Sequence, residues 1–212
     1  MSIFVTITRI EIMKIVFATN NEHKLTEISD LLGDCFTLLS LNDINIREDI
    51  PEDLPTLEEN ALLKARYIHK ITGMNVFADD TGLEIEELNG RPGVHSARFE
   101  GENKDFRANT RKVLRLMDGK KNRKAKFRTV IALILNSSEY LFEGIVSGTI
   151  LNEERGDGGF GYDPLFIPDG FKKTFAEMSL SEKNRISHRA LAFEKLKLFL
   201  SQIDTPDNKA IN

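Results

Sequence analysis

Asp79 and Asp80 are adjacent carboxylates and form the first candidate for chemistry in this chain. They follow the short apolar run 76–78, which predicts a buried strand, and they precede Thr81-Gly82. We therefore expect them at the carboxyl end of a strand, the edge of an α/β sheet where ligands bind. Two carboxylates repel each other unless a cation is near, and Mg²⁺ favours one or two carboxylates with phosphate and water. A magnesium site is one interpretation, and an aspartate-rich turn is the alternative.

A second candidate lies between a predicted strand and a predicted helix, and it consists of Thr19, Asn20, Asn21, Glu22, His23 and Lys24. The free backbone amides and the positive dipole at a helix N-terminus suit phosphate. Lys24, one turn into the helix, adds a full positive charge. The segment therefore favours a phosphate site, with an ordinary capped helix carrying a surface lysine as the alternative.

Acidic residues gather ahead of a predicted helix start: Glu48, Asp49, Glu52 and Asp53. Such charge runs usually face water. One of these carboxylates could nonetheless join Asp80 on a metal.

A glycine-rich segment spans residues 156–164 and carries four glycines among nine residues. Glycine lets the backbone approach a ligand closely, and Phe160 and Tyr162 offer rings that can stack on a flat base. The segment is not a P-loop, because no Gly-Lys-Ser/Thr follows it. A flexible surface loop is the alternative, although two aromatic side chains argue against it.

Lys183, His188 and Arg189 lie around another predicted helix start. Arginine and histidine can donate hydrogen bonds to carbonyl oxygens on a base edge, so this cluster suits a nucleotide. A basic cluster that only balances nearby acids is the alternative. The four histidines lack the spacing of a zinc site, and no signature of a covalent nucleophile is present.

The elements that must position these residues alternate along the chain. Short apolar runs predict strands at 15–18, 36–39 and 76–78, with 83–88 as a hairpin partner of the last or its continuation. Longer β-rich runs at 127–135 and 140–150 predict an antiparallel hairpin linked by residues 136–139. Helices are predicted from Asn21 to Gly33, from the Thr56-x-x-Glu59 capping box to about residue 71, at about 104–117, and around residues 190–200. This order favours an α/β fold with an elongated mixed β-sheet flanked by helices.

Bulk properties narrow the class of protein. The chain has 212 residues, which suits one large domain or two small lobes, and its net charge of -4 gives no general attraction to nucleic acid. No apolar run approaches the roughly 18 residues of a membrane span, so no membrane is expected. A single cysteine forms no internal disulfide and fits a reducing compartment. Residues 1–12 are expected to be an extension outside the core, because Met13 opens a more typical start; 13–203 form one domain, and 204–212 a polar tail.

Taken in order, these segments resemble the inosine triphosphate pyrophosphatase family, also called dITP/XTP diphosphatases, from about residue 14 to residue 199. Each motif alone is weak, but the ordered set is specific. The motifs are Ala18-Thr19-Asn20-Asn21-x-x-Lys24, Glu59-Asn60-Ala61-x-x-Lys64-Ala65, Ala78-Asp79-Asp80-Thr81-Gly82-Leu83, Pro92-Gly93-x-x-Ser96-Ala97-Arg98, Gly159-Phe160-Gly161-Tyr162-Asp163-Pro164 and Ser187-His188-Arg189.

The resemblance implies a mixed-sheet fold with a central cleft between two lobes, a homodimer, and a cytoplasmic, Mg²⁺-dependent enzyme. The implied reaction is hydrolysis of a purine nucleoside triphosphate such as ITP, dITP or XTP to the monophosphate and pyrophosphate, which removes it from the nucleotide pool. Asp80 would be the catalytic acid-base residue and a metal ligand, with Glu52 as the second ligand. The chain departs from the family at Glu52-Asp53-Leu54, where Glu-Thr-Gly is common, so Asp53 stays an alternative to Glu52.

The remaining substrate contacts follow from the same resemblance. Residues 19–24 would hold the phosphates, although Thr19-Asn20-Asn21 stands where Thr-Gly-Asn is common. Thr81, in place of the commoner serine, belongs to the substrate-binding set. The nucleotide and its base would be held by Phe160, Gly161, Tyr162, Asp163, Lys183, His188 and Arg189.

A mechanism can be written on this basis. Water activated by a carboxylate attacks the α-phosphorus, and Lys24 and Lys183 stabilise the developing charge. His188 or Arg189 donates to the 6-oxo group of the base, whereas the 6-amino group of adenine would leave two donors facing each other. Two rival functions remain, namely a hydrolase that removes only the terminal phosphate and a nucleotide-binding module without turnover.

Overall fold

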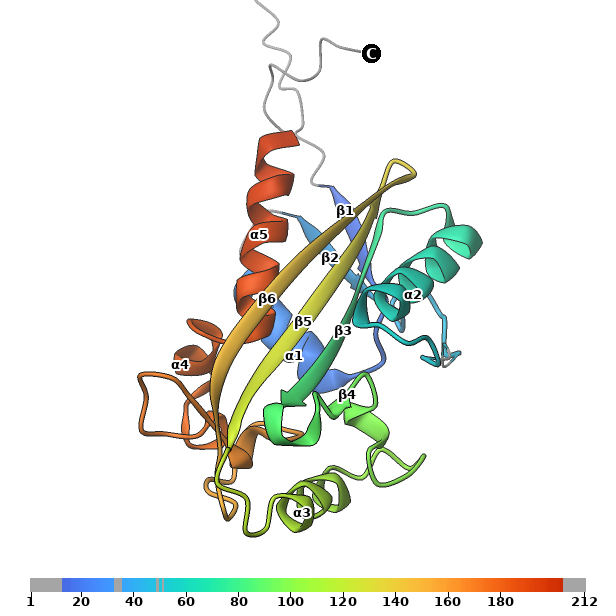
Figure 1. The fold of residues 1–212 in the computed structure, drawn as a ribbon. Coiled ribbons are helices and arrows are strands. Elements are labelled where there is room, and N and C mark those ends of the chain that lie inside the picture. The colour runs from blue at the N-terminus through green and yellow to red at the C-terminus, as the bar shows by residue number, and fades with distance from the viewer. Residues whose placement is uncertain (1–12, 33–35, 49, 51, 204–212) are drawn as a thin grey trace, which may run out of the picture.

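The structure, a computed structural model, describes residues 13–32, 36–48, 50 and 52–203, and Figure 1 shows how their elements are arranged. A mixed β-sheet has the strand order β2-β1-β3-β5-β6-β7, with β4 paired to β3. The strands are β1 (Lys14–Phe17), β2 (Thr37–Ser40), β3 (Val76–Ile85), β4 (Pro92–Gly93), β5 (Lys124–Leu135), β6 (Ser138–Ile150) and β7 (Phe166–Pro168). The helices are α1 (Glu22–Leu32), α2 (Leu57–Thr72), α3 (Phe106–Leu116), α4 (Leu180–Asn184) and α5 (His188–Ile203). This confirms the predicted α/β class and its mixed sheet.

Two helix starts follow the caps in the sequence. The Asn21 side chain accepts hydrogen bonds from the amides of His23 (3.0 Å) and Lys24 (3.3 Å), which caps α1. Thr56 caps α2 by accepting from the Glu59 amide at 3.1 Å. The Glu59 carboxylate accepts from the Thr56 hydroxyl at 2.8 Å, which differs from the bond to the Thr56 amide that a capping box has. The predicted stop of α1 at Gly33 lies outside the described residues, as do Asp49, the extension 1–12 and the tail 204–212.

Strand β3 is longer than its apolar run predicts, and this corrects the position of the two aspartates. It pairs with parallel β1 at Val76 and Phe77, and it pairs with antiparallel β5 along all ten of its residues. Asp79 and Asp80 therefore lie inside β3 rather than at its end. The carboxyl end that they adjoin belongs to β1, which stops at Phe17. Because β5 supplies hydrogen-bond partners on its side, β3 continues past the polar residues, and residues 83–85 are its continuation.

The turn between β5 and β6 has two residues instead of the predicted four. Asn136 and Ser137 both have positive φ, 48° and 65°, as a two-residue hairpin turn of type I′ requires. Ser138 already pairs with Leu135. The usual glycine at the second turn position is missing, and this hides the tight turn from sequence patterns.

Successive side chains of each strand point to opposite faces of the sheet. In the upper part of the sheet in Figure 1, this builds one hydrophobic core on each face. Phe77 belongs to the core with Phe193 of α5, and its neighbour Ala78 belongs to the core with Ala61 of α2. A third core, around Phe127, fills the lower part with α3 and β7. Strands β3, β5 and β6 run through both parts, so they join two lobes into one sheet. Among the described residues, no helix is both long and apolar enough to cross a membrane.

The C-terminal region has one element more than predicted. The sequence predicts a single helix start near Lys183, whereas the structure has two helices. Lys183 lies in α4, and α5 begins at His188 after a short turn. The turn brings both cationic segments to the same end of α5 (Figure 1).

Candidate functional site

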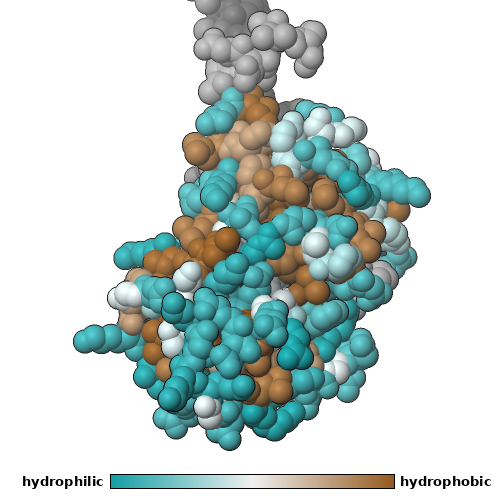
Figure 2. All heavy atoms as spheres, viewed as in Figure 1, coloured by the Kyte–Doolittle hydropathy of each residue, from teal (hydrophilic) through white to brown (hydrophobic). Residues whose placement is uncertain are grey.

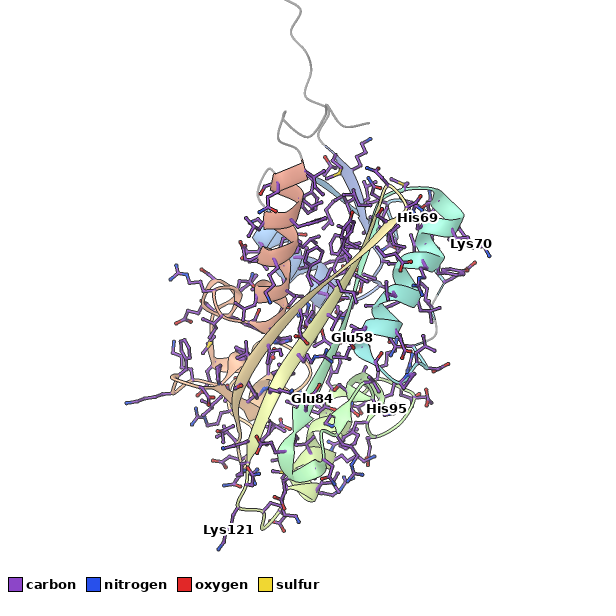
Figure 3. All side chains as sticks on the ribbon, turned by 45° about the horizontal axis from the view of Figure 1, so that its top comes forward. Glu58, His69, Lys70, Glu84, His95 and Lys121 are labelled. Atoms are coloured by element: carbon purple, nitrogen blue, oxygen red, sulfur yellow. The ribbon has the colours of Figure 1, made fainter. Side chains whose placement is uncertain are left out.

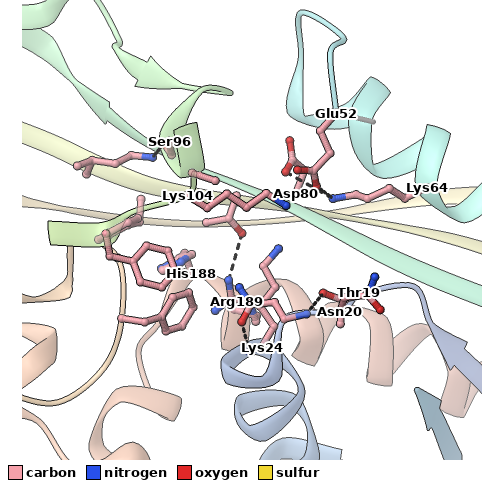
Figure 4. Close-up of a pocket in the computed structure, with 18 of the residues that line it drawn as sticks. Thr19, Asn20, Lys24, Glu52, Lys64, Asp80, Ser96, Lys104, His188 and Arg189 are labelled. Atoms are coloured by element: carbon pink, nitrogen blue, oxygen red, sulfur yellow. Dashed lines mark hydrogen bonds and ion pairs between the residues drawn. The ribbon is translucent and has the colours of Figure 1, made fainter. Parts of the chain in front are cut away.

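A cleft of about 330 Å³ lies between the two lobes, and most of the predicted site residues line it. The cleft is lined by the start of α1, by the loop before α2 and by the segments around β4 and α3. Figure 4 shows the carboxylates of Glu52 and Asp80 on one side and His188 and Arg189 on the other. The predicted residues that line the cleft are Thr19, Asn20, Asn21, Lys24, Glu52, Asp80, Thr81, Phe160, Gly161, Tyr162, Asp163, Lys183, His188 and Arg189.

Three acidic or basic residues that sequence patterns placed at the site are not among its lining residues. Glu22 and His23 are both exposed, and the His23 ring stacks on Phe160 with a centroid distance of 5.0 Å. Asp53 is also exposed, whereas its neighbour Glu52 is half-buried and faces the cleft. Of the two alternative metal ligands, the geometry favours Glu52.

The adjacent aspartates point to opposite faces of β3, because successive side chains of a strand alternate. Asp79 points toward α1 and α5, where Lys24 Nζ lies 2.8 Å from one of its oxygens. Asp80 points toward α2 and Lys64. Burial alone would raise the pKa of Asp79, but Lys24 and Arg189 outweigh it and hold that pKa well below its usual value. Asp79 is therefore a permanent anion in this pairing.

Asp80 has a different environment. Lys64 Nζ lies 2.5 Å from Glu52 and 3.6 Å from Asp80 Oδ1, so one ammonium gathers both carboxylates. The other oxygen of Asp80, Oδ2, is buried and has no hydrogen-bond partner. Burial raises the pKa of Asp80 above its ordinary value, although Lys64 acts in the opposite direction. A carboxylate that holds its proton more tightly than usual and has a bare oxygen suits a general base.

Arg189 is buried, and its guanidinium contacts three side chains. It donates to Asp79 Oδ2 at 3.3 Å, to Thr81 Oγ1 at 3.3 Å and to Glu27. Burial acts to lower the pKa of Arg189, but the two carboxylates raise it. The sequence predicts Arg189 as a reader of the base edge; the structure shows that protein groups already accept from each of its nitrogens.

Lys183 is held in the same way beside Arg189, because the Glu27 carboxylate contacts both cations. Its Nζ lies 2.7 Å from Glu27 and 2.6 Å from Asp163, with all three side chains at most 5% exposed. The Asp163 carboxylate also accepts from the Phe160 amide at 2.9 Å. Gly159 makes this possible, because its φ is +68° and a Cβ there would lie 2.2 Å from Asp163 Oδ2. The ion pair between Lys183 and Asp163 thus holds the glycine-rich segment in place.

Aromatic rings enclose the part of the cleft that lies near His188. The His188 ring stacks on Phe127 with a centroid distance of 4.6 Å and an interplanar angle of 10°. Its Nδ1 is buried without a hydrogen-bond partner, and burial lowers the pKa of His188 well below its usual value. The Phe160 ring covers Lys183 Nζ at 5.0 Å, and the Tyr162 hydroxyl donates to the Ser96 carbonyl at 2.8 Å. A neutral imidazole with a spare nitrogen between rings suits a flat polar base.

The donor set limits which metal the site can hold. Within the described ranges, no group of three His, Cys, Asp or Glu side chains is placed to hold a metal, and His69 and His95 lie far apart (Figure 3). The cleft instead offers two carboxylates, Glu52 and Asp80, and the bare Asp80 Oδ2. Two carboxylates completed by phosphate and water would suit a divalent cation that prefers oxygen ligands, such as Mg²⁺.

Sequence reasoning missed several residues that line the cleft, and it missed Glu27, which does not line the cleft but contacts Lys183 and Arg189. Lys64 stands in a family motif, but its spacing gives no sign that it pairs with Asp80, because the two are distant in sequence. Glu27 is a buried carboxylate on the inner face of α1, one position before buried Ile28. The signal that could have identified Glu27 is its position as a charged residue on the apolar face of a predicted helix, because buried charges are rare unless they are paired. The other missed residues that line the cleft include Ser96, Lys104, Phe106 and Phe127.

Known proteins share this architecture over nearly all of the chain. The sequence model of the Ham1 family matches residues 15–199. A Porphyromonas gingivalis protein named dITP/XTP pyrophosphatase is 54% identical over 188 residues, which are 88% of this chain and 97% of that protein. A Thermoanaerobacter pseudethanolicus protein of the same name is 50% identical over 89% of this chain and 96% of its own.

Solved structures agree with the sequence comparison. A HAM1 protein from Coxiella burnetii has a TM-score of 0.83 at 39% identity, covering 90% of this chain and 99% of its own. The Staphylococcus aureus Ham1 protein has a TM-score of 0.81 at 38% identity, with coverage of 89% and 98%. The matched range includes every segment that lines the cleft, and the resemblance predicted from the motifs is confirmed.

Proposed function

This chain belongs to the Ham1 family, and we propose that it is a nucleoside triphosphate pyrophosphatase. It hydrolyses the nonstandard purine nucleotides ITP, dITP and XTP to the monophosphate and pyrophosphate, and so removes them from the nucleotide pool. Relatives about half identical to it carry the name dITP/XTP pyrophosphatase. The observation that carries the proposal is the buried Asp80 carboxylate, because Asp80 lines a cleft that is also lined by cationic and aromatic side chains.

Asp80 is the general base of the proposed reaction. It takes the proton of a water molecule while the water oxygen forms a bond to the α-phosphorus. The bond from the α-phosphorus to the bridging oxygen breaks, and pyrophosphate leaves with that oxygen. The raised pKa of Asp80 supports this role, because a base is most effective when its pKa approaches the working pH.

Positive side chains offset the charge of the polyphosphate. Lys64 lies beside Asp80, and Lys24 lies in the first turn of α1, at the positive end of the helix dipole. Glu52 and Asp80 would hold Mg²⁺, which supplies further charge neutralisation on the phosphate oxygens when bound. Lys183 lies deeper, between Glu27 and Asp163, so its contribution is to the base end of the cleft.

Base selection is proposed to depend mainly on His188. Phe160 stacks on any purine and does not discriminate. A neutral His188, which lines the cleft, can donate one hydrogen bond to the 6-oxo group of hypoxanthine or xanthine. The 6-amino group of adenine is a donor, and an unpaired buried donor is unfavourable.

The test is a panel of ITP, dITP, XTP, ATP and GTP with Mg²⁺, scored separately for pyrophosphate and orthophosphate. Pyrophosphate from the oxo-purine nucleotides, with little from ATP, is the expected result. Orthophosphate as the product would indicate a terminal phosphatase instead. Nucleotide binding without turnover at saturating Mg²⁺ would indicate a regulatory binding module.

We also propose that the enzyme is a homodimer that acts in the cytoplasm. Support for a dimer comes from Leu141 and Ile145, which lie on one face of β6 and are 47% and 40% exposed. Figure 2 shows apolar surface among the polar side chains of the molecule. Light scattering on the purified protein gives the molecular mass directly, and a mass of one chain would exclude the dimer. Localisation is checked by fractionating cells that produce the protein.

A further inference from the structure

Three small residues lie side by side across the sheet, directly under the start of α5. Thr81 of β3 pairs with Thr129 of β5, and Thr129 pairs with Gly144 of β6. Thr129 is fully buried, on the same face as Ile131, which belongs to the core that α5 covers. His188 and Arg189, the first two residues of α5, both line the cleft.

Gly144 determines how closely α5 approaches the sheet. A Cβ built at this position would lie 2.0 Å from the His188 carbonyl oxygen and 2.6 Å from the Ala192 amide nitrogen. Both atoms belong to helix backbone, which cannot turn aside as a flexible side chain can. Any side chain at this position would push the first turn of α5 away from β6.

Thr129 connects the same part of the sheet to Arg189. Its hydroxyl lies 2.7 Å from the Thr81 hydroxyl. Thr81 in turn accepts from Arg189 at 3.3 Å and donates to Asp79 at 3.2 Å. The Thr81 hydroxyl therefore links the Arg189 guanidinium to Thr129 of β5.

We propose that Gly144 and Thr129 are positioning residues for the nucleotide site. Gly144 fixes the depth of the first turn of α5, and Thr129 fixes the Thr81 hydroxyl that orients Arg189. Together they place His188 against the substrate and hold Arg189 beside it, although neither Gly144 nor Thr129 lines the cleft. This inference rests on the proposed function, because that function assigns His188 to the nucleotide.

The first experiment compares Gly144→Ala with Leu200→Ala. Leu200 is a buried residue of the same helix, 12 positions after His188, so its truncation weakens the packing of α5 without crowding the first turn. Steady-state kinetics with ITP, at a temperature where both variants are folded, give KM and kcat. Gly144→Ala is expected to raise KM at least about tenfold, since a misplacement of about 1 Å can change rates by up to 100-fold. Leu200→Ala is expected to keep the KM of the parent. Equal KM values for Gly144→Ala and the parent would overturn the proposal, and so would equal changes in both variants.

A second pair covers the case in which Gly144→Ala does not fold. Thr129→Val keeps the shape of the side chain and removes only the hydroxyl, whereas Thr129→Ser keeps the hydroxyl. We expect Thr129→Val to raise KM by about fivefold to tenfold, the effect of one net hydrogen bond, and Thr129→Ser to restore most of it. A Thr129→Val enzyme with the KM of the parent contradicts the role of Thr129.

Failure of the proposed function can be told apart from failure of this inference. A parent protein that releases no pyrophosphate from any oxo-purine nucleotide contradicts the proposed function alone. Calorimetric titration with ITP in the absence of Mg²⁺ then tests whether Gly144 positions the nucleotide site. Weaker ITP binding by Gly144→Ala than by Leu200→Ala would support this role. Equal affinities would contradict it. A crystal structure of Gly144→Ala adds a direct readout, because the His188 carbonyl must have moved away from β6.

Discussion

At the scale of single residues, the two adjacent aspartates have opposite electrostatic roles. Asp79 is paired with Lys24 and Arg189 and stays ionised, whereas Asp80 is buried with one bare oxygen. Residue types alone predict that this pair is chemically important. They cannot assign the roles, because the alternation of side chains about β3 and the partners on each face are properties of the folded sheet.

The first prediction concerns the activity of Asp80→Asn. The amide cannot take a proton from water, so kcat is expected to fall at least about a hundredfold, the low end for loss of a general base. Circular dichroism and thermal melting check that the variant is folded. A folded variant with the turnover of the parent would show that another group activates the water.

The second prediction concerns the stability of the same variant in metal-free buffer. The pKa of Asp80 is raised in the folded protein, so its ionisation opposes folding. This destabilisation is absent below the unfolded pKa of about 4 and reaches its full size as the pH rises through the folded pKa. Asp80→Asn is therefore expected to melt above the parent at neutral pH, with the difference disappearing in acid. Melting curves with a chelator at several pH values measure it, and a difference independent of pH would contradict the shift.

The third prediction concerns the metal. Glu52 reaches the cleft beside Lys64, whereas Asp53 is exposed. Glu52→Gln removes one anionic oxygen ligand and is expected to shift the Mg²⁺ concentration for half-maximal activity upward, with Asp53→Asn as the matched control at the parent value. Magnesium titrations of the three proteins decide it. Superimposable curves for Glu52→Gln and the parent would remove Glu52 from the metal site.

The fourth prediction separates His188 from Arg189. Because Arg189 donates to Asp79, Thr81 and Glu27, Arg189→Lys is expected to lower kcat/KM for ITP and ATP by similar factors. His188→Ala is expected to lower kcat/KM for ITP more than kcat/KM for ATP, so the ratio of the two values falls. The fall corresponds to a free energy on the order of 1 to 3 kcal/mol, the contribution of one buried hydrogen bond. The ratio cancels any loss of folded enzyme. A narrowed ratio in Arg189→Lys with an unchanged ratio in His188→Ala would reverse the assignment.

At the scale of elements, local sequence patterns predict the helices and their caps. They do not predict the parts of an element that form only because another strand pairs with it. The apolar periods of α2 and α5 and the caps Asn21 and Thr56 are local, and the structure follows them. The full length of β3 is not local, because residues 79–85 are held by their ladder with β5. The separate helix α4 is missed for a related reason: its five residues are too short to give a period of their own.

The fifth prediction belongs to the β5–β6 turn. Ser137 has a φ of 65°, which a side chain disfavours and glycine adopts freely. Ser137→Gly is expected to stabilise the protein by up to about 1 kcal/mol, since relief of the strained φ exceeds the extra chain entropy of glycine. Denaturant unfolding gives the difference in free energy, and equal or lower stability would show that the turn carries no strain. The turn lies at the far end of the hairpin from the cleft, so kinetics should not change (Figure 1).

At the scale of the whole molecule, one sheet serves two lobes. Strands β3, β5 and β6 pass from the cores under α2 and α5 into the core around Phe127, and the cleft opens where β1 ends and β3 continues. The ordered motifs predict the family, the class of fold and more than half of the residues that line the cleft. They cannot predict the ion pairs that link α1 to α5 through Glu27, because partners 162 residues apart leave no local pattern. Asp80 therefore obtains its unusual environment from long-range packing: Val76 and Ala78 precede it on the α2 face of β3, and Lys64 reaches it from α2. A buried carboxylate with a bare oxygen opposes folding unless the surrounding cores outweigh it, and this fold places that carboxylate on β3 between Ala78 of the core under α2 and Leu83 of the core around Phe127.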